Sequence, residues 1–267
     1  KDTKPRIAIV DFDVHHGNGT EACVRNLSPN MQPLPMPSSW CPRYEASYKP
    51  WLDEDDQKDT FFGSVQLYIG EHFYPGSGND EVTTYDEETG TGINLCNIGL
   101  APVGPGPCDA TTRHRMSEKQ KAIYCSQASA ELRNKIESLL LPAIRSFQPT
   151  LLILSSGFDA HYDDIYHYLT EEDFAWMTER LCEVAVDECG AHGVISILEG
   201  GYSLSSPIKP PKLKKKIGIT ANKASPEKFQ PPGSDPLTRY AQEPGDGGLV
   251  KSVLGHVAGL AGVPWWK

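Results

Sequence analysis

The sequence lacks any apolar run long enough to cross a bilayer, and it opens on the polar residues 1–5 rather than on a secretory signal. Its seven cysteines are odd in number, and none forms a Cys-x-x-Cys pair. We therefore expect free thiols in a reducing compartment, the nucleus or the cytoplasm, and no cysteine-ligated zinc. A hydrophobic content of 39% and a charged content of 22% are ordinary for a globular protein.

Basic residues are also scarce, because 25 lysines and arginines stand against 35 acidic residues, for a formal net charge of −10. An acidic surface repels the nucleic-acid backbone, so we expect no direct nucleic-acid binding and no membrane attachment. The same surface suits cationic protein segments such as lysine-rich tails. On charge alone, solubility is the simpler explanation of the acidity.

Chemically reactive residues follow three apolar runs that the pattern predicts as buried strands. These are 7–10 followed by Asp11, Asp13 and His15, 151–154 followed by Asp159, and 194–198 followed by Gly200, Gly201 and Tyr202. Strands that alternate with helical patterns predict an α/β fold, a parallel β-sheet with helices on both faces. Open sheets of this kind bind ligands at the carboxyl ends of their strands.

The first loop holds the densest group of candidate ligands. If strand geometry persists past residue 10, Asp11, Asp13 and His15 point to the same side. Unpaired carboxylates gathered at one point are costly to bury, and a divalent cation relieves that cost. One histidine with two aspartates leaves coordination positions open, as in catalytic zinc sites, although such a set also suits iron(II) or manganese(II). The plain alternative is a capping turn, because Asp, Asn, Gly and Thr all favour turns.

Periodic patterns predict the remaining elements. We expect a helix over 117–147, capped by Ser117 with Gln120 and interrupted at Pro142. A second helix begins after Thr170, and its apolar stripe is most simply core. Shorter segments complete the prediction: strands at 65–69 and 93–98, a polar loop at 80–92, and helices at 21–27 and 248–261.

Two proline-rich stretches read as insertions, at about 28–60 and 205–247. The first shows no periodicity and holds the acidic run 53–56, so it is either functional or disordered. The second carries the basic block 212–216, which suits an acidic partner or nuclear import. A solvated loop is the simpler interpretation of that block.

Four segments carry a resemblance to a known family: DFDVHHGNGT at 11–20, FYPGSG at 73–78, SSGFDAH at 155–161 and LEGGYSL at 198–204. They resemble the signature segments of the zinc-dependent histone deacetylases, in the same order, and the Glu-Gly-Gly-Tyr ending resembles the class II branch. The resemblance covers most of the chain outside the two insertions. It implies an arginase/deacetylase-like domain that removes acetyl or other acyl groups from lysine side chains of histones or other proteins, in a tunnel ending at zinc.

Carried over position by position, the resemblance implies that Asp13, His15 and Asp159 bind the zinc. Tyr202 would then stabilise the transition state. The main-chain carbonyls of Asp11, Asp13 and His15 would line a structural potassium site. Further positions support the ligands or line the tunnel: Asp11, His16 and Asn18 behind the metal, and Phe73, Tyr74, Gly200, Gly201 and Tyr166 along the tunnel.

The chain also departs from the family pattern. The family's general base is a His-His pair upstream of the first strand, and His15-His16 matches the metal loop instead. We therefore expect residues 1–267 to be a single domain lacking its N-terminal part, with a complementary N-terminal segment supplying the base. His161 is a weaker candidate for that role. Because this chain has Tyr166 and a shorter connection before it, the resemblance does not determine the shape of the tunnel rim.

Two other functions fit the same residues. One is an amidohydrolase of the acetylpolyamine type, which would differ mainly at the tunnel rim. The other is a metal-binding module that docks partners without turnover, and the missing base favours it for the isolated chain.

Overall fold

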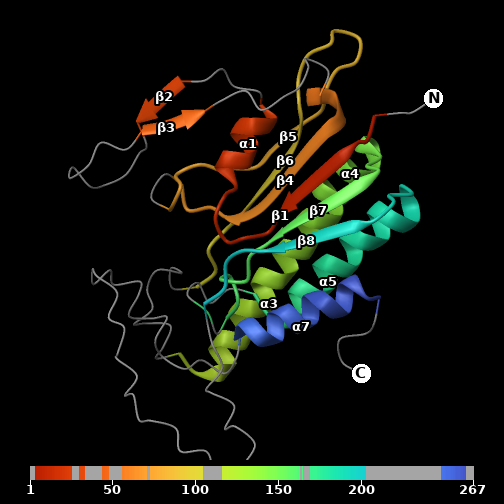
Figure 1. Cartoon of the computed structure of the whole chain (residues 1–267). Helices are drawn as coiled ribbons and strands as arrows, with labels where there is room; N and C mark the ends of the chain where they lie inside the picture. The colour runs from red at the N-terminus through yellow and green to blue at the C-terminus, as the bar shows by residue number, and fades with distance from the viewer. Residues whose placement is uncertain are drawn as a thin grey trace, which may run out of the picture.

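In the computed structural model, the chain builds one six-stranded sheet in the order β5-β6-β4-β1-β7-β8 (Figure 1). The structure describes residues 4–25, 30–33, 44–47, 56–70, 73–104, 116–162, 164, 169–202 and 248–262. The strands are β1 Ile7–Asp11, β4 Thr60–Leu67, β5 Glu81–Thr83, β6 Asn94–Leu100, β7 Leu151–Ser156 and β8 Val194–Leu198. All pairs are parallel except β5 with β6. The predicted α/β fold class is confirmed.

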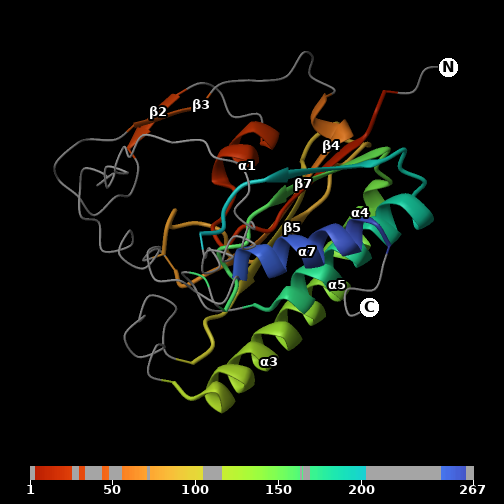
Figure 2. The same ribbon diagram turned by 60° about the horizontal axis from the view of Figure 1, so that its bottom comes forward.

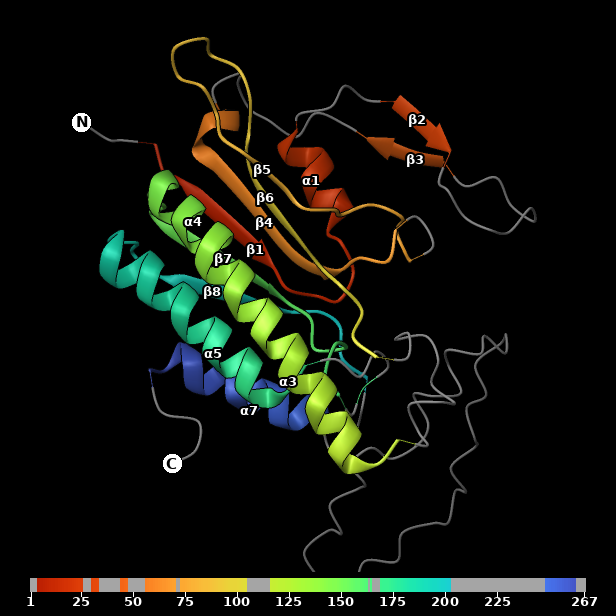
Figure 3. The same ribbon diagram turned by 180° about the vertical axis from the view of Figure 1, so that it is seen from behind.

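Helices lie on both faces of the sheet (Figures 2 and 3). They are α1 Asn18–Val24 on one face, and α3 Glu118–Lys135, α4 Leu141–Phe147, α5 Glu171–Cys182 and α7 Gly248–Leu260 on the other. Strand β1 shows the division, because Ala8 and Val10 join the main core that α3, α4 and α5 cover. Ile9 points the other way and packs with Phe62 and Val24 beneath α1. The sequence of β1 therefore buries both of its faces, as in parallel sheets generally.

The long helix predicted over 117–147 is continuous along the chain. Ser117 caps α3 and forms the expected capping box with Gln120, which confirms the predicted start. A π-helical turn, η2 Ile136–Leu140, joins α3 to α4, and Pro142 lies in the first turn of α4. The π-helical turn ends two residues before Pro142, so the α-helical pattern is interrupted there as predicted, although the chain continues directly into α4.

Other boundaries differ from the prediction. Strand β4 begins at Thr60, five residues before the predicted start, because Phe61 and Phe62 bury on opposite faces of the sheet. The stretch expected to be a polar loop contains β5, and the first insertion contains the hairpin β2 Asn30–Pro33 and β3 Tyr44–Ser47, followed by the turn η1 Asp56–Asp59. Such short polar strands are defined by their pairing with each other, and their sequences show no alternation of apolar and polar residues that would predict them. The second insertion lies outside the described residues.

The closing helix α7 packs closely on α5. A Cβ atom added at Gly255 or at Gly259 would come within 2.8 Å of a backbone carbonyl of α5, so the two helices meet backbone to backbone. His256 lies between them, with Nδ1 2.7 Å from Thr178 Oγ1 and Nε2 2.7 Å from Ser196 Oγ of β8. Burial lowers the pKa of His256 to about 4, so it joins helix α7 to the sheet as a neutral ring.

Strand β8 lies at one end of the sheet, and within the described residues it pairs only with β7. Four of its five side chains are apolar, and three of these are open to solvent, with Ile195 48%, Ile197 51% and Leu198 61% exposed. An uncharged apolar strand at a sheet edge offers free backbone groups to another chain. This open edge of β8 is therefore the surface of the described residues best suited to accept a further strand.

The buried carboxylate of Asp173 joins α3 to the start of α5. It accepts hydrogen bonds from the Thr170 backbone N–H (3.0 Å), the Ser129 hydroxyl (2.6 Å) and Arg133 (3.3 Å). We predict that Asp173→Ala lowers the free energy of unfolding by about 2–3 kcal/mol, the range for hydrogen bonds to a charged group. Denaturant titration measures the loss.

Ser117→Ala removes an exposed cap at the far end of α3 and is the control, with an expected loss of about 1 kcal/mol. If the two variants cost the same, Asp173 does not contribute as a tie between helices.

Candidate metal centre

Three candidate ligands converge at the carboxyl ends of β1 and β7. Asp13 and His15 lie in the loop after β1, Asp159 follows β7, and one ligand atom from each lies within 4.8 Å of the others. His15 Nδ1 is 2.9 Å from Asp13 Oδ1 and 3.6 Å from Asp159 Oδ2. The two strands are neighbours in the sheet, so their loops meet at the edge where α/β folds bind ligands.

The loop after β1 bends immediately after the strand ends at Asp11. The Asp11 carboxylate accepts from the Asp13 N–H at 3.0 Å, and the Asp13 carboxylate accepts from the His15 N–H at 2.8 Å. These two consecutive side-chain turns replace the extended geometry that the shared orientation of Asp11, Asp13 and His15 assumed. That expectation is wrong for Asp11, which supports the loop backbone and is not among the three converging groups.

Glycines make room for the crowded carboxylates. A Cβ atom at Gly157 or at Gly200 would overlap Asp13 Oδ2, and one at Gly17 would overlap Asp11 Oδ2. Because Gly200 has no side chain, the carboxylate of Asp13, from the loop after β1, can approach its backbone closely. Gly157 was not predicted as a site residue, because its place in the sequence is that of an ordinary turn residue.

The acids of the site perturb one another. Burial is the largest cause that raises the pKa of Asp159, followed by the negative charge of Asp13. Burial acts in the same direction on Asp13, but hydrogen bonds from His15 outweigh it and hold the pKa of Asp13 below its usual value. Burial, with the charges of Asp13 and Glu199, raises the pKa of Asp11 to about 7. A divalent cation would stabilise all these carboxylates, so the donor set fits such an ion.

An aromatic turn covers the imidazole of His15. Phe73 stacks on that ring with centroids 5.3 Å apart at 10°, and Tyr74 meets it edge-on at 5.7 Å. Phe73 is buried, whereas Tyr74 is 58% exposed. The predicted tunnel residues thus lie beside a predicted ligand, with Tyr74 facing solvent.

His16 holds this turn from the other side. Its Nδ1 lies 2.8 Å from Ser77 Oγ and its Nε2 lies 2.6 Å from Glu21 Oε2. Burial raises the pKa of Glu21, but contacts with His16, Asn97 and Arg25 outweigh it and lower the pKa to about 2. Glu21 and Ser77 were not predicted as site residues, because no local sequence pattern indicates that a helix residue and a turn residue meet at His16.

Tyr202 lies in the segment after β8, four residues beyond the end of the strand, and is 48% exposed. Its backbone N–H donates to Asp164 Oδ2 at 2.7 Å. Burial raises the pKa of its hydroxyl, as do the negative charges of Asp159 and Asp13, which lie near it. Asn18 is the first residue of α1, and its backbone N–H donates to the His16 carbonyl at 2.8 Å. Tyr166 lies outside the described residues.

His161 and His256 are hydrogen-bonded to groups other than the converging ligands, and His192 lies far from them. His161 is fully buried, with Nε2 3.0 Å from Glu171 Oε2 at the start of α5. His256 is bonded to Thr178 and Ser196, and His192 lies just before β8 at the opposite end of the strand. Within the described residues, no histidine is thus placed as a general base, and His161 is committed to α5.

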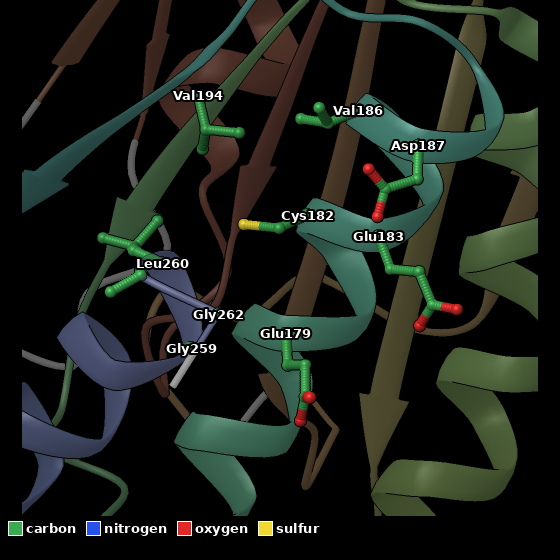
Figure 4. Close-up of a pocket in the computed structure, with 10 residues that line it drawn as sticks. Glu179, Cys182, Glu183, Val186, Asp187, Val194, Gly259, Leu260 and Gly262 are labelled. Carbon is green, nitrogen blue, oxygen red and sulfur yellow. The ribbon is translucent and has the colours of Figure 1, made fainter. Parts of the chain in front are cut away.

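A hollow of about 680 Å³ lies elsewhere, between the end of α7, the start of β8 and the end of α5 (Figure 4). Three acidic side chains and a thiol line it: Glu179, Glu183, Asp187 and Cys182. Because Val194, the first residue of β8, also lines it, this hollow is at the opposite end of the strand from the metal ligands.

The raised pKa of Asp11 makes stability depend on pH. A carboxyl group whose pKa rises from 3.8 to about 7 on folding stabilises the fold below pH 4, and this contribution is lost as pH rises through 7. We predict that the metal-stripped chain melts at a lower temperature at pH 8 than at pH 5. Asp11→Asn keeps the oxygen that accepts from Asp13, so it should reduce this dependence and leave the part that comes from the raised pKa of Asp159. Identical slopes for both proteins would contradict the assignment to Asp11.

Comparison with known proteins agrees with this geometry. The model of the histone deacetylase domain family matches residues 1–209. Type-2 histone deacetylase 2 of Dictyostelium discoideum is 31% identical over 205 residues, covering 74% of this chain and 9% of that protein. Histone deacetylase 10, chloroplastic, of Oryza sativa subsp. japonica is 30% identical over 203 residues, covering 75% of this chain and 32% of that protein.

A solved structure, that of the histone deacetylase Clr3, shares the fold with a TM-score of 0.50 at 22% identity, over 97% of this chain and 27% of that one. The chain thus spans less than half the length of each of these relatives. A family match over most of its length, in the fold and with the site described above, shows that this chain belongs to the histone deacetylase domain family.

Proposed function

We propose that this chain carries the metal-binding part of a protein lysine deacetylase, which removes acetyl or other acyl groups from lysine side chains of histones or other proteins. The observation that carries the proposal is the convergence of Asp13, His15 and Asp159 within 4.8 Å. Tyr202 lies close enough for the charges of two of these ligands to raise its pKa. Such a donor set beside a protonated phenol suits hydrolysis of an amide.

We propose zinc as the resident ion, held by Asp13, His15 and Asp159, with iron(II) as the alternative that two carboxylates also accept. When bound, such an ion polarises the acyl carbonyl and lowers the pKa of a water molecule. A structural potassium ion at the carbonyls of Asp11, Asp13 and His15 is part of the same proposal. The bent loop after β1 brings these three residues into one turn.

The side chains of the chain itself have separate tasks in this proposal. The Tyr202 hydroxyl, protonated at neutral pH like any ordinary tyrosine, donates a hydrogen bond to the developing oxyanion. Phe73 and Tyr74 form an aromatic wall next to His15, suited to the methylene stem of an acylated lysine. Gly200 leaves the space in which Asp13 reaches the ligand position.

The proton acceptor is proposed to come from a complementary N-terminal segment of the same domain that supplies a His-His pair. Two observations on the described residues support this: His16, His161 and His256 are hydrogen-bonded to side chains other than the ligands, and β8 presents an open apolar edge. A strand added to that edge would lie beside the loop that carries Tyr202, within reach of the metal ligands. Without such a segment, a metal-binding module without turnover is the second candidate.

The proposed setting is the nucleus or the cytoplasm, with a lysine-rich protein tail as substrate. The five described cysteines are all free thiols, which suits a reducing compartment. The formal charge of −10 suits a cationic substrate. None of the helices in the described ranges combines the length and apolar character that a bilayer crossing requires.

The function is tested with the complete domain, by metal analysis and by turnover of an acetyl-lysine peptide. We predict that Asp159→Ala loses both metal and turnover. Tyr202→Phe should keep the metal and lower kcat by roughly 10²–10³, the usual loss for one oxyanion donor. Full metal content in Asp159→Ala would disprove the ligand set. Unchanged kcat with a lowered melting temperature in Tyr202→Phe would make the tyrosine structural.

The open edge of β8 gives a separate prediction about the partner segment. Residues 1–267 alone should turn over acetyl-lysine negligibly and aggregate, and adding the upstream segment as a second chain should restore turnover. Ile195→Lys should block this restoration, because a charged side chain disfavours strand addition at that edge. Ile123→Lys on α3 changes an isoleucine of equal exposure, 48%, and should leave it intact. If turnover is restored equally in the two variants, β8 is not the edge at which the segment docks.

A further inference from the structure

The packing around Tyr202 does not by itself fix the position of its phenol ring. The side chain is 48% exposed, and it follows Gly200 and Gly201, the latter at φ 126°. Glycines in succession widen the backbone choices of a segment, and a half-exposed ring is weakly restrained by its neighbours. A phenol that must aim at one reacting atom needs its backbone held by something else.

Asp164 supplies that restraint. Its side chain is almost completely buried, with the residue 4% exposed, and its Oδ2 accepts from the Tyr202 backbone N–H at 2.7 Å. An ionised acceptor makes such a bond roughly twice as strong as one between neutral groups. The bond links the segment after β7, which carries Asp159, to the segment after β8, which carries Tyr202.

The backbone of Asp164 is itself held in place. The Asp164 backbone N–H donates to the His161 carbonyl at 2.8 Å, and His161 is fully buried against Glu171 of α5 at 3.0 Å. A second bond joins the same two segments, from the Phe158 N–H to the Gly200 carbonyl at 2.9 Å. Tyr202 is thus fixed relative to Asp159 through a short path anchored in a helix.

We propose that Asp164 is a positioning residue for the deacetylase reaction: by binding the Tyr202 backbone, it holds the phenol at the acyl oxygen. This inference rests on the proposed function and deepens it. Asp164 acts through Tyr202, touches no reacting atom and transfers no proton.

The test is a double-mutant cycle in the complete domain, with kcat and KM measured on an acetyl-lysine peptide. Asp164→Ala should lower kcat by roughly 10- to 100-fold, the scale of a small misplacement of a catalytic group, with KM and metal content little changed. Asp164→Asn keeps an acceptor oxygen and should recover most of kcat. In the Tyr202→Phe background, Asp164→Ala should have almost no further effect. An undiminished effect in that background would overturn the proposal.

Hydrogen exchange of the Tyr202 amide gives a measurement that does not depend on turnover. The amide should exchange slowly in the wild type and in Asp164→Asn, and faster in Asp164→Ala, with the amides of β7 unchanged. Unchanged protection in Asp164→Ala would show that Asp164 does not anchor Tyr202, whatever the activity. Lack of turnover in the wild-type domain would overturn the proposed function, while exchange still decides whether the anchor exists.

Discussion

Repulsion among buried carboxylates governs the carboxyl end of this sheet. Asp11, Asp13 and Asp159 come from two neighbouring strands, and the pKa values of Asp11 and Asp159 are held above their usual range by burial and by nearby negative charge. The surrounding structure offsets this cost with groups that donate to the acids, chiefly backbone N–H groups of the bent loop after β1. Glycines at the points of closest approach complete the arrangement, because any side chain there would overlap a carboxylate oxygen. The site is therefore built to hold negative charge together, which is the property that a cation requires.

The residues that support this site come from elements far apart along the chain. Glu21 of α1 and Ser77 of the aromatic turn meet at His16, and Asp164 meets Tyr202 across two loops. Each contact fixes one wall of the site against another, so the aromatic turn, the ligands and the tyrosine are linked through side chains that touch no substrate. Enzyme sites commonly depend on such a supporting layer for their precision.

The strand ends could be predicted from the sequence, because apolar runs mark buried strands and the residues after them share one edge of the sheet. The set of Asp13, His15 and Asp159, which converge in the structure, was implied by the family resemblance of the loops after these strands. The sequence also indicated the cap at Ser117 correctly. The shared orientation expected for Asp11, Asp13 and His15 was wrong, because alternation holds only while the strand continues, and here the chain bends as soon as β1 ends. Glu21, Ser77, Gly157 and Asp164 were missed for a different reason. Their roles depend on which segments meet in the folded chain, and no local pattern records that.

The backbone-to-backbone packing of α7 on α5 has a consequence for the chain between Tyr202 and Gly248. Both anchors of that stretch are fixed independently of it, one by the Asp164 bond and the other by the glycine contacts of α7 with His256 between the helices. The entropic free-energy cost of joining two fixed ends grows only with the logarithm of the number of residues between them, by about 0.6 kcal/mol for each doubling. Because both ends are held by contacts of their own, the stability of the described fold depends only weakly on how many residues separate Tyr202 from Gly248, even though one of those ends lies beside a site that tolerates very little.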